Sequence, residues 1–117
     1  MIGIVVRFDM RSPESAAQFD DLTQEVMAAI VANEPGTIVY ATQSVIAQPL
    51  ARVFYEIYAD KESLQAHEDA PHVLAFHARK EALLSAPPRI EYLTLGPAKG
   101  LAGAALGGDS SHDRYAF

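Results

Sequence analysis

Residues 52–58, RVFYEIY, decide the fold that the sequence predicts. Alternate side chains of this segment form two sets, which are Val53, Tyr55 and Ile57, and Phe54, Glu56 and Tyr58. Alternation is typical of a β-strand, and both sets carry aromatic or aliphatic side chains. We therefore expect a strand in a sheet whose two faces are both covered.

The sequence before this strand predicts a strand, a helix and a second strand. Residues 2–8, IGIVVRF, are apolar and β-branched, as strands are. Ser12-Pro13 is a helix start, and apolar residues then recur every three or four positions at Phe19, Leu22, Val26, Ala29 and Ile30. Glu34-Pro35-Gly36 ends this helix, residues 37–45 form the second strand, and residues 46–51 form a loop that holds Pro49.

The sequence after residues 52–58 predicts a broken helix and a last strand. Asp60 is a good N-cap, Pro71 interrupts the helix, and a second segment runs from about residue 72 to 85. Residues 88–95, PRIEYLTL, form the last strand. The order strand, helix, strand, strand, helix, strand predicts an α+β protein, with two helices on one face of a four-stranded antiparallel sheet. A second copy of the chain is the simplest cover for the other face, so we expect a homodimer.

Composition divides the chain into a domain, residues 1–95, and a tail, residues 96–117. The tail is rich in glycine and alanine, and we expect it to be flexible or loosely docked.

Charge and composition argue against several classes of function. The 117 residues carry a net charge of −6 and no cluster of lysine or arginine, which argues against nucleic acids and anionic membranes as partners. No apolar run is long enough to cross a membrane, and the N-terminus does not look like a signal peptide. The chain has no cysteine, which excludes disulfides and thiol nucleophiles. A cytoplasmic location is the expectation.

Three of the four histidines lie in residues 67–77, HEDAPHVLAFH. On an unbroken helix, a spacing of five residues would point them in different directions, so we expect no metal site. His67 and His72 flank the break at Pro71, where they could bind free backbone groups or line a pocket. His77 follows Phe76, and we expect it to point inward, either as a core residue or as a ligand.

Glu56 is the other candidate for chemistry. A carboxylate on a covered face needs partners, and a histidine or Tyr58 could supply them. A histidine paired with a carboxylate is a base that works near neutral pH. The tyrosines, among them Tyr40 and Tyr58, could be core residues or could line an apolar pocket.

Residues 34–93 resemble the antibiotic biosynthesis monooxygenase family, and with the opening strand and helix the likeness reaches about residue 95. The resemblance rests on Glu34, Gly36, Tyr40, Glu56, Tyr58, Leu64, His67, Pro71-His72 and Phe76. It implies a dimeric α+β barrel, in which two ferredoxin-like protomers pack sheet to sheet.

The best-known members of this family oxidise quinols and phenolic polyketides with dioxygen and without a cofactor. By resemblance, His67 or His72 is the base and Glu56 orients it. Tyr40, Tyr58, Phe76 and His77 would then line the pocket of a small aromatic substrate.

Two other branches and a third possibility remain as alternatives. The haem-degrading branch would use His77 as its haem ligand, but His67 stands where that branch has a catalytic tryptophan, and the chain has no tryptophan. The isomerase branch acts by acid–base chemistry on a small phosphorylated signal. The third possibility is a small-molecule binding protein without activity, which could bind haem through His77.

Overall fold

The computed structural model of the chain describes residues 1–101. Its elements follow in the order β1 (Ile2–Asp9), α1 (Pro13–Asn33), β2 (Thr37–Val45), β3 (Gln48–Tyr58), α2 (Lys61–Asp69), α3 (Pro71–Lys80), the 3-10 turn η1 (Glu81–Leu83) and β4 (Arg89–Thr94). This is the predicted α+β order. Most of the predicted flexible tail, residues 102–117, lies outside the described residues.

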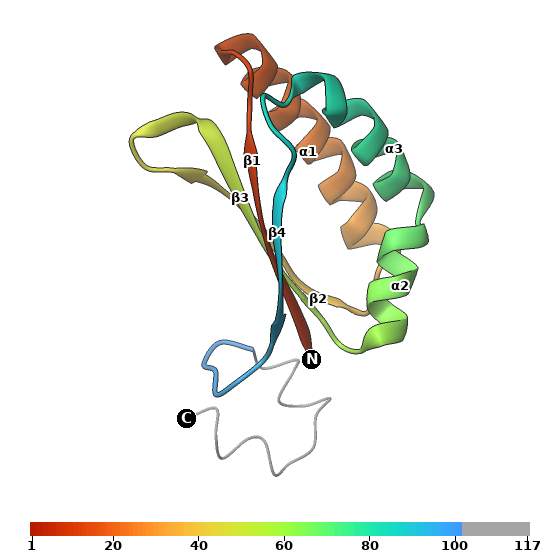
Figure 1. Ribbon diagram of the computed structural model, residues 1–117. Coiled ribbons are helices and arrows are strands. Elements are labelled where there is room, and N and C mark those ends of the chain that lie inside the picture. Colours follow the sequence, from red (N-terminus) through yellow and green to blue (C-terminus); the bar gives the residue numbers. More distant parts are fainter. Residues whose placement is uncertain (102–117) are drawn as a thin grey trace.

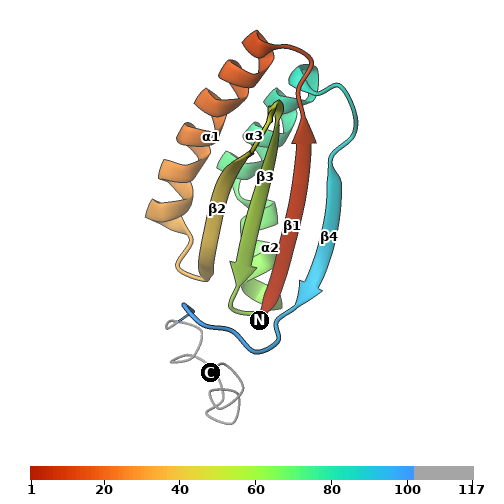
Figure 2. The ribbon, with the colours of Figure 1, turned by 90° about the vertical axis from the view of Figure 1, so that its left-hand side faces the viewer.

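The four strands form one antiparallel sheet in the order β2-β3-β1-β4. All three helices lie on one side of it (Figure 1). Seen from the opposite side, β4 forms an edge of the sheet beside the helices and not in front of them (Figure 2). Ile90 and Tyr92 of β4 therefore stay 48% and 64% exposed, although their pairing with Val6 and Ile4 puts them on the face toward the helices.

The two long helical segments begin as the sequence predicts. The Ser12 hydroxyl accepts a hydrogen bond from the Ser15 N–H at the start of α1, and the Asp60 carboxylate accepts one from the Ser63 N–H at the start of α2. The helix is interrupted at Ala70. Pro71 is the first residue of α3, a position where the missing N–H of proline costs nothing.

Two predicted boundaries are wrong. The helix expected to reach residue 85 ends at Lys80 and tightens into η1, whose last turn is closed by a bond from the Leu84 N–H to the Glu81 carbonyl. The loop expected at residues 46–51 is mostly strand, because β3 begins at Gln48. The hairpin turn is only Ile46-Ala47, and Ala47 takes a left-handed φ of 65° to close it.

Aromatic packing holds the helices to the sheet. The rings of Phe8, Phe19, Phe54 and Phe76 lie with centroids 4.9 to 6.4 Å apart, in tilted, edge-on and stacked arrangements. They come from β1, α1, β3 and α3, so one cluster joins both layers. The core cluster draws on residues of β1, α1, β3, α3 and η1 and on none of α2, whose one buried side chain is the polar His67.

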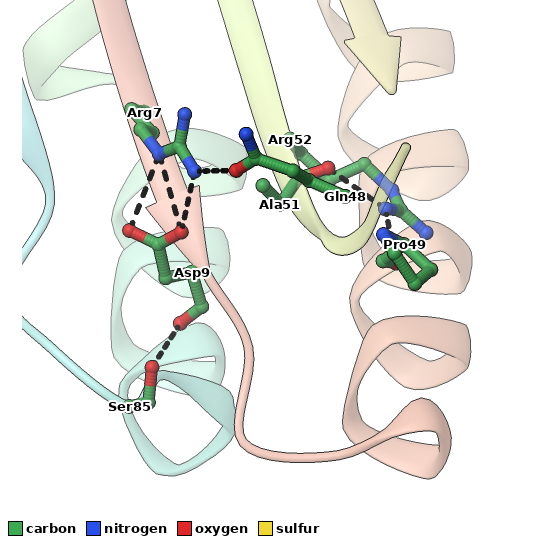
Figure 3. Close-up of polar contacts among 7 residues, drawn as sticks. All are labelled: Arg7, Asp9, Gln48, Pro49, Ala51, Arg52 and Ser85. Atoms are coloured by element: carbon green, nitrogen blue, oxygen red, sulfur yellow. Dashed lines mark hydrogen bonds and ion pairs between the residues drawn. The ribbon is translucent and has the colours of Figure 1, made fainter. Parts of the chain in front are cut away.

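Polar contacts pin the β2–β3 hairpin to the rest of the sheet (Figure 3). The Arg7 guanidinium donates to the Asp9 carboxylate and, at 2.5 Å, to the Gln48 side-chain oxygen. Arg52 donates to the carbonyls of Pro49 and Ala51 and forms an ion pair at 2.9 Å with Asp20 of α1. These contacts fix the far end of the sheet, away from the histidines.

The described helices are all too short or too polar to cross a membrane.

Candidate functional site

A cavity of about 150 Å³ lies between α3 and the sheet. Its apolar lining comes from Ile4, Val6 and Phe8 of β1, Phe76 of α3, and Pro88, Ile90 and Tyr92 in and before β4. Its polar lining consists of Tyr40, Glu56, His67, Glu68, His77 and Lys80. The cavity thus collects five of the seven residues that the sequence predicted for the site, namely Tyr40, Glu56, His67, Phe76 and His77.

A carboxylate that the sequence analysis did not assign to the site joins two of the histidines. Glu34 accepts a hydrogen bond from His67 Nδ1 at 2.7 Å through one oxygen, and from His72 Nε2 at 2.5 Å through the other. The Thr37 hydroxyl donates a third bond at 2.7 Å. The Glu34 side chain is only 6% exposed, so these partners replace water around it.

These bonds define the protonation of the cluster. Burial alone would raise the pKa of Glu34, but the hydrogen bonds from Thr37, His72 and His67 outweigh it and hold this pKa below its usual value. The carboxylate is therefore ionised at neutral pH and can only accept. It follows that His67 carries a proton on Nδ1 and His72 carries one on Nε2.

The second ring nitrogen of His67 faces the cavity. No buried side-chain nitrogen or oxygen of residues 1–101 lacks a hydrogen-bond partner, and His67 Nε2 has no partner among them. Nε2 must then be accessible, and since His67 is 5% exposed and lines the cavity, the access is from the cavity. A neutral His67 thus offers a basic lone pair at this point.

Two tyrosines enclose the imidazole of His67. The ring centroids of Tyr40 and Tyr58 lie 5.5 and 5.1 Å from that of His67. The Tyr58 hydroxyl donates to Glu56 at 2.6 Å. Desolvation, with Glu56 nearby, raises the pKa of both tyrosines well above the usual value, so both stay neutral.

Glu56 faces the helices and is 6% exposed. Burial raises its pKa to about 7, against the opposing effect of the Tyr58 hydrogen bond. The expectation that Glu56 orients a histidine is wrong in its geometry, since Glu56 binds Tyr58 and Glu34 binds the histidines. Glu56 is instead a carboxyl group that lines the cavity and can change protonation near neutral pH.

His72 lies on the other side of Glu34. It lines an open groove of about 770 Å³ together with Glu34, Thr37, Gly36 and Ser63. Glu34 therefore connects a buried histidine that lines the cavity to a histidine that lines the open groove.

Two basic residues of α3, His77 and Lys80, also line the cavity. His77 is exposed overall, so the prediction that it points inward is only partly right, but it borders the cavity and contacts the Phe76 ring at 5.7 Å between centroids. Lys80 is 4% exposed, because Val73, Phe76 and Lys80 form the stripe of α3 that faces the sheet.

The sequence prediction omits Glu34 and Lys80 from the site, although the sequence carries a signal for each of them. Glu34 caps the C-terminus of α1, where the helix dipole disfavours a negative charge, so a carboxylate there calls for donors nearby. Lys80 lies four positions after Phe76, on the same helical face, where a charge is unusual.

The part of the chain that the structure describes holds no group of three or more histidine, cysteine, aspartate or glutamate side chains arranged for a metal ion.

The antibiotic biosynthesis monooxygenase family model matches residues 1–79 of the chain. None of the curated proteins matches this chain. Among solved structures, a protein of Caulobacter crescentus, named as a candidate antibiotic biosynthesis monooxygenase, is 29% identical, with a TM-score of 0.76 over 80% of this chain and 88% of the other.

Two further structures support the same fold. NE2512 of Nitrosomonas europaea, described as a protein of unknown function, is 26% identical, with a TM-score of 0.71 over 84% of this chain and 91% of its own. Rv0793 of Mycobacterium tuberculosis is 23% identical, with a TM-score of 0.73 over 80% of this chain and 93% of its own.

Proposed function

Because the chain belongs to the antibiotic biosynthesis monooxygenase family, we propose that its cavity oxidises a quinol or a related phenol with dioxygen and without a cofactor. The observation that carries the proposal is the hydrogen bond of His67 Nδ1 to the ionised Glu34, which leaves Nε2 free toward the cavity. A carboxylate in this position fixes the tautomer of the base and stabilises its protonated form.

In the first step, His67 Nε2 takes the proton of a substrate hydroxyl. The resulting phenolate is electron-rich enough to give an electron to dioxygen directly. For a hydroquinone, the overall change is the insertion of one oxygen atom, with loss of water and formation of a hydroxyquinone. The organic product and the water together contain the two oxygen atoms of dioxygen, and the substrate supplies all the electrons.

The cavity favours this reaction by its lining. Phe76, Ile90 and Val6 provide an apolar surface for an aromatic ring. Tyr40 and the protonated form of Glu56 can donate hydrogen bonds to the developing anion, and the limited access of water strengthens those bonds. Glu56 is suited to this role, since a pKa of about 7 keeps about half of it protonated at neutral pH.

We also propose that the protein is a homodimer that packs through the outer face of the sheet. The side chains on this face, opposite the helices, include Val5, Val39, Val53, Tyr55 and Leu93, all only partly buried in the single chain. Arg7, Gln43 and Glu91 lie on the same face, and the apolar side chains among them are more stable when a second copy covers them.

Oxygen uptake tests the activity. Metal-stripped protein with naphthoquinols and anthrones should consume oxygen faster than the spontaneous oxidation, and His67→Ala should return the rate to that background. Gln65→Ala, on the exposed face of the same helix, is the matched control and should retain full activity. Equal uptake by His67→Ala and the unaltered protein would remove His67 from the role of base, and uptake no faster than background in all variants would refute the oxygenase.

A further inference from the structure

The ammonium group of Lys80 is buried, but few acceptors among the described residues contact it. The Lys80 side chain is 5% exposed, yet among residues 1–101 its ammonium contacts only the His77 carbonyl, at 3.5 Å, and Glu81, at 3.8 Å. Glu81 is 72% exposed on its side chain, so water screens that ion pair. An ammonium has three donors, and burying it without good acceptors is unfavourable.

The positions of Lys80 and of the proposed base follow from α3 and α2. Lys80 is the last residue of α3, about 14 Å along the helix axis from Pro71, and His67 lies on α2, beyond the break at Ala70. Val6, Phe76 and Ile90 supply apolar lining to the same cavity. The cavity therefore has a cationic end at Lys80 and an acid–base end at His67.

The charges at the two ends would orient a ligand. Glu56 and Glu68 line the cavity together with His67, and Glu34 lies directly behind that imidazole. A group that is already anionic when it binds is disfavoured beside Glu68 and the ionised Glu34 and is attracted to Lys80, with the His77 ring beside it. A hydroxyl, which has a proton to give, is the group that suits the His67 end.

We infer that Lys80 binds a carboxylate of the substrate, so that the substrate class is a hydroxylated aromatic acid whose ring lies between Lys80 and His67. This inference rests on the proposed function, because it adds the substrate class to the same cavity. It makes Lys80 a substrate-binding residue and gives the unusual charge on the buried face of α3 a role.

Binding without oxygen tests this inference separately from catalysis. The ligands are 2,5-dihydroxybenzoate and its homologues with one and two methylene groups before the carboxylate, each beside its neutral methyl ester. Titration calorimetry under anaerobic conditions should show at least one acid binding about tenfold or more tighter than its ester, as expected for a charge-assisted hydrogen bond. Lys80→Met should abolish that preference and Lys80→Arg should retain part of it.

Lys61→Met is the matched control, since Lys61 is an exposed residue at the start of α2, and it should keep the full preference. Lys80→Met should fold, because it removes an ill-paired buried charge and keeps the length of the side chain. Thermal unfolding of each variant verifies this.

The outcomes separate the two proposals. Equal binding of acid and ester in the unaltered protein, or a preference that survives in Lys80→Met, would overturn the carboxylate subsite even if neutral quinols are oxidised. A Lys80-dependent preference without oxygen uptake would support the subsite and refute the oxygenase. Displacement of the acid by inorganic phosphate at a lower concentration than the acid itself would assign Lys80 to phosphate and overturn the inference.

Discussion

Glu34 is the residue on which the site depends most, because it holds two histidines from different helices. Its two oxygens bind His67 of α2 and His72 of α3, and it is itself fixed at the end of α1. Loss of its charge would leave both imidazoles without a fixed tautomer. The backbone around it would change little, since Thr37 could still donate to a neutral side chain at this position.

We therefore expect Glu34→Gln to lower kcat about 100-fold or more, because a general base that loses its orienting carboxylate loses most of its effect. The measurement is oxygen uptake under saturating quinol. Glu62→Gln, an exposed residue of the neighbouring groove, is the control and should leave kcat unchanged. A Glu34→Gln variant with unaltered kcat would show that the Glu34–His67 pair has no part in the reaction.

Glu56 predicts a pH dependence of stability. Its pKa rises from 4.5 to about 7 on folding, because burial disfavours the carboxylate. A raised pKa favours the folded state fully below about 4.5, and this contribution is lost as the pH rises through about 7. The difference corresponds to about 3 kcal/mol.

The variant Glu56→Gln removes this titration and can still accept from Tyr58. Urea unfolding should show that, from pH 5 to pH 8, the free energy of unfolding of Glu56→Gln rises by roughly 2.5 kcal/mol relative to that of the unaltered protein. The exposed Glu91→Gln serves as the control and should run parallel to the unaltered protein. A constant difference between Glu56→Gln and the unaltered protein over this range would contradict a raised pKa.

At the scale of single residues, the sequence predicts which side chains lie at the site better than which of them bind one another. The sequence predicts His67, His72, Glu56 and Tyr40 for the site, and in the structure Glu34 binds both histidines while Tyr40, Glu56 and His67 line one cavity. The assignment of Glu56 to a histidine failed because the pairing depends on where α1 ends relative to α2 and α3, which local pattern does not determine. Lys80 was missed for a related reason, since its burial follows from the packing of α3.

At the scale of elements, the turn between α1 and β2 has the strictest steric requirement, because it needs a glycine at position 36. A Cβ atom on Gly36 would lie 2.5 Å from Ser63 Cβ and closer still to the Ser63 hydroxyl oxygen. Gly36 thus allows the end of α1, which carries Glu34, to approach the start of α2. The break at Ala70 then brings His72 to the other side of the same carboxylate.

Gly36→Ala should lower the free energy of unfolding by about 1–3 kcal/mol, because the new methyl group has no space and Ser63 must move. The test is chemical denaturation, with Gly96→Ala as the control, since no atom lies within 4 Å of a Cβ at Gly96. The double variant Gly36→Ala/Ser63→Gly should regain part of the loss. Equal stability of Gly36→Ala and Gly96→Ala would mean that α2 is not held against this turn.

The sequence predicts the elements themselves well, because β-branched runs, caps and prolines act locally. The two errors, at residue 80 and at residues 46–51, have a common physical origin. The helix tightens into η1 where Arg11 binds the Leu83 and Leu84 carbonyls, and β3 is extended by pairing with β2. Both depend on contacts between distant segments.

At the scale of the whole molecule, the sheet separates two surfaces with different roles. The face toward the helices holds the aromatic core and the cavity, and β4 leaves its end open through Ile90 and Tyr92. The other face is the free side of the sheet that Figure 2 presents to the viewer. The alternation in residues 52–58 predicts both surfaces, because it puts Phe54, Glu56 and Tyr58 on the first and Val53, Tyr55 and Ile57 on the second.

If two copies pack through the second surface, a charge in its middle should separate them. Tyr55 lies opposite Val5 of β1 and Ala41 of β2, so it is central to that face. Tyr55→Glu should halve the mass measured by light scattering or sedimentation at micromolar concentration, since a carboxylate buried in an apolar interface is strongly unfavourable. Leu74→Glu is the control, because Leu74 is 55% exposed on α3, on the opposite side of the molecule, and should leave the mass unchanged. A monomeric mass for the unaltered protein would refute the dimer, and the apolar side chains of this face would then have to be covered by some other means.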